Sequence, residues 1–169
     1  ARLAGLYVQT LKNDPRPPVK RAVLPRLIQV QLERMEDPER AYESTKALVK
    51  VLQDRQEQLD RLQALASDTE RWADLVDFLE SLLGPDPTDV PLLRRTASLA
   101  LTQLDDGDRA LMHQRTILAL DASDLQARDA VTTILTDMEA WEELVDHLRT
   151  IADDHRDKDT AREALLMAA

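Results

Sequence analysis

An internal repeat constrains this sequence more than any other feature. The segment Trp72-Ala-Asp-Leu-Val-Asp-Phe-Leu79 returns 69 residues later as Trp141-Glu-Glu-Leu-Val-Asp-His-Leu148, with five of eight positions identical. A second segment, Asp37-Pro-Glu-Arg-Ala41, returns at the same distance as Asp106-Gly-Asp-Arg-Ala110. The two segments alternate along the chain, so 69 residues contain two units of about 34.5 residues each, and a fixed period of this length is typical of stacked repeats.

Each unit is predicted to consist of two helices. Apolar residues recur at helical spacing in Leu59, Leu62 and Leu65, and again in the stripe that begins at Trp72. A non-repetitive helical bundle is the alternative, but two segments with the same offset argue against it. The expected helices lie near residues 2–12, 19–35, 38–52, 56–67, 70–83, 88–104, 107–120, 123–137, 140–153 and 158–169.

Start signals for helices occur at the expected places. Asp37-Pro38-Glu39 and Asp86-Pro87-Thr88-Asp89 each offer an Asp cap, a Pro at the first helical position and an acid in the first turn. Ser67 with Glu70, and Ser123 with Gln126, have the spacing of a capping box. Pro25 is expected to kink the helix over 19–35 or to mark its true start.

Composition excludes several classes of protein. The 169 residues include no Cys and only 3 Gly, so a disulfide framework, a thiolate zinc site, a Cys nucleophile and a glycine-rich phosphate loop are excluded. The 2 Trp, 2 Tyr and 1 Phe are too few for a typical β-sandwich or barrel. The net charge of −10, with basic residues scattered among acids, argues against nucleic acid as a partner, and no apolar run is long enough for a membrane span.

Sites for metals, cofactors or catalysis are not predicted. His147 and His155 stand eight residues apart near several Asp residues, but a metal site needs three or four converging ligands. His113 is isolated, and no Ser lies in a Gly-x-Ser-x-Gly motif. We therefore expect no metal, no cofactor and no enzymatic activity.

The two-helix unit and its motifs resemble the tetratricopeptide repeat, in a degenerate variant of the kind found in large bacterial repeat proteins. Trp-x-x-Leu-Val-x-x-Leu and Asp-Pro-x-Arg-Ala carry the resemblance, which extends over nearly the whole chain. HEAT-like repeats of about 40–47 residues are the lesser alternative. The resemblance implies an all-α, right-handed superhelical solenoid of antiparallel helix pairs, with units 1–18 (partial), 19–54, 55–86, 87–122, 123–157 and 158–169 (partial) forming a single helical-repeat domain.

The resemblance also implies roles for particular residues. Core packing is expected of the repeated apolar and small positions, which are Ala41, Trp72, Leu75, Leu79, Ala110, Trp141, Leu144 and Leu148. The first helix of each unit is expected to line a concave binding face. Its candidate residues are Gln29, Glu33, Glu57, Asp60, Asp68, Arg94, Ser98, Thr102, Gln126, Asp129, Thr133 and Asp137.

The function expected from this resemblance is that of a non-enzymatic scaffold, which binds a peptide or a partner protein on the concave face. The acidic residues of that face would select basic or amide-rich ligands. Two alternatives stay open, a self-assembling structural repeat protein (filament or coat) and a helical-repeat part of a larger enzyme. Both predicted ends lack polar capping repeats, so we expect a fragment of a longer repeat protein that is prone to end-to-end or swapped self-association. The compartment stays open, with the cytoplasm favoured.

Overall fold

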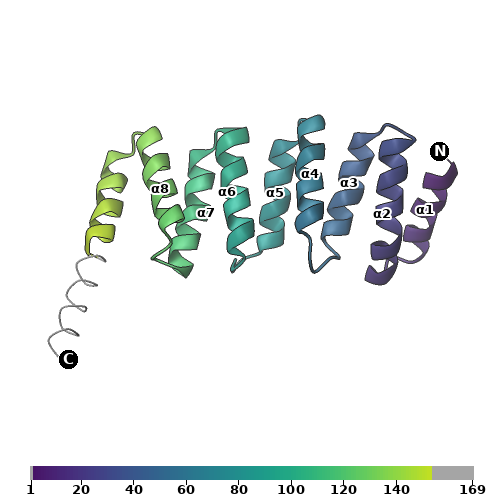
Figure 1. Ribbon diagram of the computed structural model, residues 1–169, viewed down its shortest axis with the longest axis horizontal. Helices are drawn as coiled ribbons and strands as arrows, with labels where there is room; N and C mark the ends of the chain where they lie inside the picture. Colours follow the sequence, from purple (N-terminus) through teal and green to yellow (C-terminus); the bar gives the residue numbers. More distant parts are fainter. Residues whose placement is uncertain (1, 154–169) are drawn as a thin grey trace, which may run out of the picture. The chain divides into compact units, whose positions relative to one another are not determined.

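The computed structural model describes residues 2–153, and every element in that range is a helix (Figure 1). The predicted helix over 158–169 lies outside the described residues. The helices agree with the predicted positions, the largest difference being at the end of α3, predicted at 52 and found at Val49. They are α1 (Arg2–Asn13), α2 (Pro17–Glu33), α3 (Pro38–Val49), α4 (Gln56–Asp68), α5 (Trp72–Leu83), α6 (Val90–Leu104), α7 (Gly107–Leu120), α8 (Leu125–Asp137) and a last helix over residues 141–153.

The chain divides into two compact units, Ala1–Gly84 and Pro85–Ala169, which we call the N-terminal and C-terminal units. In the N-terminal unit each of the helices α1 to α5 packs against the next one in the chain. In the C-terminal unit α6 packs on α7, and α7 on α8. Short connections make successive helices antiparallel, as Figure 1 shows within each unit. The boundaries of the individual repeat units stay predictions.

A tight turn between paired helices recurs with the period of the sequence repeat. In each turn one residue other than glycine has a left-handed backbone, and these residues are Glu36 (φ 50°), Glu70 (φ 54°), Asp105 (φ 54°) and Glu139 (φ 55°). The next residue's amide donates back to a carbonyl in the last turn of the preceding helix, at 2.9 to 3.0 Å. Because this conformation is unfavourable for an L-residue, its fourfold recurrence is a built feature of the fold. Glu36 and Asp105, like Glu70 and Glu139, are 69 residues apart.

Aspartate side chains cap several helices, although not always where the sequence predicts. The Asp37 carboxylate accepts from the Arg40 amide at 3.0 Å, which confirms that predicted cap, and Asp106 accepts from Arg109 at 2.9 Å. The prediction at Asp86 is wrong. α6 begins four residues later than a helix capped there, because Asp89 is the cap and Pro91 provides the early proline.

Three other expectations about helix ends are corrected. Asp124 caps α8 by accepting from the Ala127 amide at 2.8 Å, whereas the Ser123 hydroxyl bonds to Asp121. Ser67 lies inside α4, which continues to Asp68. Pro25 lies inside α2 and does not mark its start, because Pro17 already begins that helix.

The helices form two rows in each unit, as a stack of helix pairs requires. We call α2, α4, α6 and α8 the first helices, and α3, α5, α7 and residues 141–153 the second helices. In the N-terminal unit, side chains of α2 and α4 line one hollow together, and ion pairs join α3 to α5. In the C-terminal unit, an ion pair joins α6 to the cap of α8, and another joins α7 to the last helix.

The predicted core anchors differ in their burial. Ala41, Leu75, Leu79 and Ala110 are buried, and Trp72 and Leu144 are half-buried. Trp141 and Leu148 contradict the core position predicted for them, because they are 56% and 46% exposed. The helix over 141–153 is the last one that the structure describes, so among the described residues no following helix covers its outer side.

Candidate functional site

The predicted binding residues of the N-terminal unit gather where α2 and α4 meet. The Gln29 side-chain amide donates to the Glu33 carboxylate, with N–O distances of 3.0 and 3.2 Å. Both side chains line a hollow of ≈ 390 Å³ whose other wall includes Arg61 of α4. An Arg61 nitrogen lies 3.9 Å from an oxygen of Glu57. The hollow thus has an amide, a carboxylate and a guanidinium at its edge.

The same face carries more carboxylates than it can neutralise itself. Asp60 and Asp68 are exposed on α4, in addition to Glu33 and Glu57. Arg61 is the basic residue that the structure places among them. An exposed excess of negative charge attracts cationic groups and accelerates their encounter. This α2–α4 face can therefore hold a basic or amide-bearing segment by hydrogen bonds and charge.

The predicted binding residues of the C-terminal unit include one that has a structural role. Arg94 of α6 pairs with Asp124, the cap of α8, and its side chain is only 24% exposed. Its Nη1 is buried and has no hydrogen-bond partner among the described residues. Arg94 thus ties two first helices together, and it is not a freely extending cation.

The remaining predicted residues of this unit lie exposed on α6 and α8. The Thr102 hydroxyl donates to the Ser98 carbonyl at 2.8 Å, and the Thr133 hydroxyl to the Asp129 carbonyl at 3.0 Å. These bonds are local to one helix and leave the carboxylate of Asp129 at the surface. The exposed set consists of Ser98, Thr102, Gln126, Asp129, Thr133 and Asp137.

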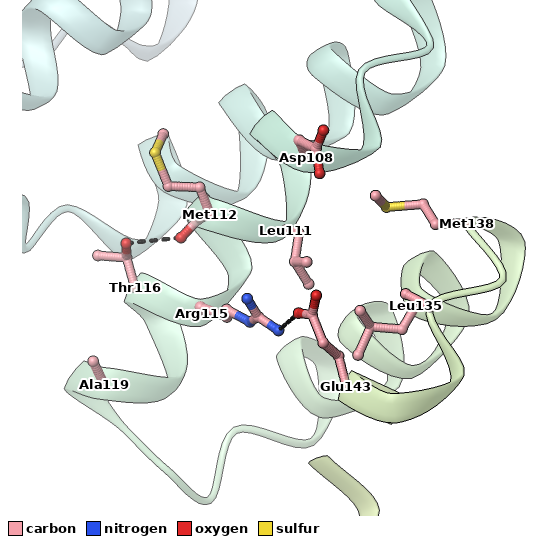
Figure 2. A pocket seen from close by; sticks show the side chains of 10 residues that line it. Asp108, Leu111, Met112, Arg115, Thr116, Ala119, Leu135, Met138 and Glu143 are labelled. Carbon is pink, nitrogen blue, oxygen red and sulfur yellow. Dashed lines mark hydrogen bonds and ion pairs between the residues drawn. The ribbon is translucent and has the colours of Figure 1, made fainter. Parts of the chain in front are cut away.

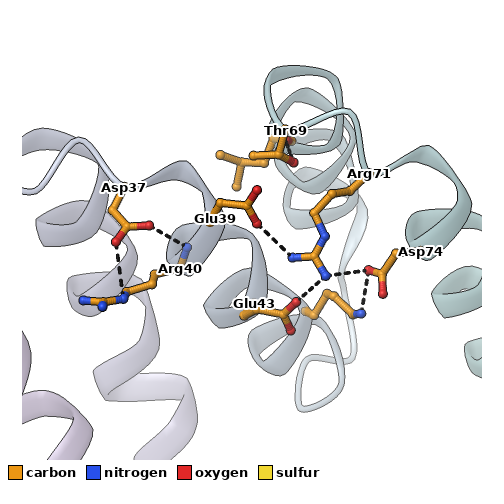
Figure 3. Close-up of polar contacts among 9 residues, drawn as sticks. Asp37, Glu39, Arg40, Glu43, Thr69, Arg71 and Asp74 are labelled. Atoms are coloured by element: carbon orange, nitrogen blue, oxygen red, sulfur yellow. Dashed lines mark hydrogen bonds and ion pairs between the residues drawn. The ribbon is translucent and has the colours of Figure 1, made fainter.

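A cluster of charged residues joins the second helices of the N-terminal unit, and sequence reasoning did not find it (Figure 3). The Arg71 guanidinium lies 2.6 Å from Glu43, 3.4 Å from Glu39 and 3.5 Å from Asp74. It also stacks on Tyr42, with 4.3 Å between the guanidinium carbon and the ring centroid. We call these five residues, together with Lys46, the Arg71 cluster.

Lys46 and the ring of Tyr42 complete the Arg71 cluster. Lys46 lies 2.8 Å from the Asp74 carboxylate and 5.5 Å from the centroid of the Tyr42 ring. Tyr42 is fully buried. Its hydroxyl meets no partner at strict hydrogen-bonding geometry, yet the nearby Asp74 carboxylate still influences its pKa.

The charges in the Arg71 cluster shift two pKa values. Burial raises the pKa of Tyr42 well above its ordinary range, and the neighbouring Asp74 raises it further. Burial also acts to raise the pKa of Asp74, but hydrogen bonds from Lys46 and Tyr42 and the nearby positive charges outweigh it. The pKa of Asp74 is therefore lowered, and its carboxylate is held ionised.

An open hollow of ≈ 510 Å³ lies on the second helices of the C-terminal unit (Figure 2). Its apolar lining includes Leu111 and Leu135, which are buried, and Met112 and Met138, which are 52% and 40% exposed. Asp108 and an ion pair with a nitrogen–oxygen distance of 2.5 Å, between Arg115 and Glu143, are its charged groups. Exposed Met side chains are adaptable contact groups, so the hollow can receive an apolar stem beside a charge.

Sequence reasoning missed the basic residues and the Met residues of these sites. It ranked residues by a family's first-helix positions, and Arg71, Arg115 and Met138 are on second helices or in the turns that precede them. Arg61 is on a first helix but was not among the mapped positions. Comparing the side chains at positions 69 residues apart would have pointed to Arg71, whose counterpart is Ala140.

The histidines have local structural surroundings where the structure describes them. His113 is buried, and His147 Nε2 lies 3.2 Å from the Arg128 carbonyl. His155 lies outside the described residues. Over residues 2–153, no three or more His, Cys, Asp or Glu side chains converge as metal ligands would. None of the helices described is long and apolar enough to cross a membrane.

The paired helices, the recurring turn and the two rows together define a tetratricopeptide-like helical-repeat protein. Two solved structures share this fold. The crystal structure of MamA is 15% identical with a TM-score of 0.50, and the match covers 93% of this chain and 89% of that one. A tetratricopeptide repeat protein from Parabacteroides merdae ATCC 43184 is also 15% identical with a TM-score of 0.50, over 89% of this chain and 58% of that one. No protein-family model matches the sequence, and no curated protein matches it.

Proposed function

We propose that the chain is a non-enzymatic scaffold that binds a peptide or a partner protein along the first helices. The tetratricopeptide-like fold supports this, because stacked helix pairs present an extended surface without any rearrangement. The observation that carries the proposal is the α2–α4 face, where Gln29, Glu33 and Arg61 border one hollow. Its surplus of carboxylates favours a basic or amide-rich ligand.

Selection of ligands followed by charge removal tests this proposal. Peptides from a displayed random library are selected on the immobilised chain, synthesised with a fluorescent label and measured by anisotropy. The double variant Glu33→Gln/Glu57→Gln is expected to weaken binding about tenfold, because hydrogen bonds to ionised groups contribute about 1.5–3 kcal/mol.

A matched control separates the face from net charge. Asp86→Asn/Glu142→Gln removes the same two charges at exposed positions away from the α2–α4 face, and it should leave the affinity within about twofold. Equal weakening by both variants, or selected peptides that bind neither better than scrambled versions, would contradict the proposed site.

Self-association is a second candidate that a separate observation favours. Leu3, Leu6 and Val8 are exposed on α1, and Trp141, Val145 and Leu148 on the last described helix. Exposed apolar groups of this kind often belong to interfaces. Sedimentation velocity over a wide range of concentrations tests it, because a self-assembling chain gains mass with concentration and a monomeric scaffold does not.

A further inference from the structure

The hollow of the C-terminal unit and the Arg71 cluster occupy equivalent places in the repeat. The five positions concerned match at an offset of 69 residues, which pairs Asp108 with Glu39, Leu111 with Tyr42, Arg115 with Lys46, Ala140 with Arg71, and Glu143 with Asp74. The ion pair between second helices is kept in both places, at 2.8 Å for Lys46–Asp74 and 2.5 Å for Arg115–Glu143. The caps Asp37 and Asp106 and the left-handed turn residues have the same offset.

The two places differ in what fills them. In the N-terminal unit the Arg71 guanidinium and the Tyr42 ring are stacked between the acidic residues, as Figure 3 shows. In the C-terminal unit Ala140 and Leu111 stand at these positions, and both side chains are smaller. The hollow of ≈ 510 Å³ is the space that a guanidinium and a ring occupy in the other copy.

The charges that hold Arg71 are largely retained around the hollow. Two of its three acidic partners have acidic counterparts, Asp108 and Glu143, and Arg115 is the single basic residue of the lining. The third partner, Glu43, corresponds to Met112, which is more than half exposed. The lining therefore carries a net negative charge beside an apolar wall, which suits a cation with an aliphatic stem.

One backbone position makes room for the apolar wall. A side chain at Gly107 would place its Cβ 2.8 Å from the Met138 sulfur, so only glycine leaves that side chain where it borders the hollow. In Figure 2 Met138 and Leu111 lie on the side of the hollow near Asp108, with Arg115 and Glu143 across from them.

We propose that this hollow binds an arginine side chain supplied by a partner peptide. The guanidinium takes the place that Arg71 has in the other copy and donates to Asp108 and Glu143, while its methylene stem lies on Met112 and Met138. Arginine fits better than lysine because a planar guanidinium can donate to two carboxylates at once and can stack flat on Leu111. The site is on the second helices, so it is separate from the α2–α4 face and is tested independently.

Methionine methyl signals report on this site directly. The chain has 4 Met residues, of which Met112 and Met138 line the hollow and Met35 does not. The full chain with ¹³C-labelled Met methyl groups is titrated with the capped tripeptide Gly-Arg-Gly. Met112 and Met138 should shift saturably and Met35 should not. The tripeptide with neutral citrulline in place of Arg should bind at least about tenfold more weakly, because it lacks the charge.

Two variants with the same added charge decide the result. Ala140→Arg supplies the guanidinium from within the chain and should abolish the response to Gly-Arg-Gly. Ala73→Arg, at an exposed position of α5, should leave the response unchanged. No saturable shift up to about 10 mM peptide, or an unchanged response in Ala140→Arg, would overturn the proposal.

The alternative occupant is the chain's own C-terminal segment, which contains Arg156 and Arg162. If Arg156→Gln/Arg162→Gln moves the Met112 and Met138 signals without any peptide, the occupant is internal and a partner arginine is ruled out as proposed. Unmoved signals, together with a retained response to Gly-Arg-Gly, support the partner.

Discussion

Replacing Arg71 by alanine tests whether the Arg71 cluster stabilises the N-terminal unit. Its side chain is 25% exposed, and its partners Glu43, Glu39 and Asp74 are 55%, 62% and 39% exposed. Ion pairs this accessible contribute about 0.2–1 kcal/mol each. The stacking on Tyr42 at 4.3 Å adds about 1 kcal/mol, since that ring is fully buried. We therefore expect Arg71→Ala to lower the free energy of unfolding by about 2 kcal/mol.

Arg115→Ala is the matched control in the C-terminal unit. Arg115 and its partner Glu143 are 50% and 55% exposed, and no ring lies beneath the guanidinium among the described residues. Its replacement should cost about 0.5 kcal/mol. Urea unfolding followed by circular dichroism measures both variants, provided that the slope with denaturant stays equal to that of the parent chain.

Two further measurements distinguish stacking from charge. In about 1 M salt the ion pairs are screened, so Arg71→Ala should keep roughly half of its effect through stacking and packing. Arg71→Lys keeps the charge but loses the planar group, and it should be intermediate. If Arg71→Ala and Arg115→Ala cost the same within error, the reasoning about the filled and the open place is refuted.

Three further predictions concern pH, helix caps and the Trp pair. The lowered pKa of Asp74 makes a stabilising contribution that is present above its unfolded pKa of about 4 and is lost as the pH falls through the folded value; Asp74→Asn should flatten that decline in acid unfolding, and an unaltered decline would contradict it. Asp37→Ala and Asp106→Ala should each cost about 1 kcal/mol in thermal unfolding, whereas Asp86→Ala, at the predicted cap that the structure does not use, should cost almost nothing. Trp72→Ala should cost about 3 kcal/mol and Trp141→Ala less than half of that, because Trp141 is 56% exposed; equal losses would show that Trp141 is buried in solution.

The helices could be predicted because their signals are local. Apolar spacing and the cap at Asp37 act within one or two turns of chain, so the sequence shows them directly. Asp86 misled because Asp86 and Asp89 both carry start signals, and only packing selects the second. The left-handed residues could not be predicted, since Glu36, Glu70 and Glu139 are not residues that favour this conformation. Tertiary packing imposes it on them.

The sites were less predictable than the fold. Gln29 and Glu33 were placed by position in the unit, but the hollow also needs Arg61, whose location depends on how α4 packs beside α2. Arg94 has the expected sequence position, yet the cap of α8 engages it. The hollow beside Met112 arises from two small side chains far apart in sequence, Leu111 and Ala140, and only the comparison with the Arg71 cluster shows what is missing there.

The central claim is that positions 69 residues apart are structurally equivalent, and backbone dihedral angles measure this directly. Three-bond couplings between amide and α protons, with ¹³Cα chemical shifts, determine φ at the four turn residues in solution. The account predicts positive φ at Glu36, Glu70, Asp105 and Glu139, each between two helical segments. A helical, negative φ at either member of the pairs 36/105 or 70/139 would contradict it, and the comparison of the open hollow with the Arg71 cluster would then lose its basis.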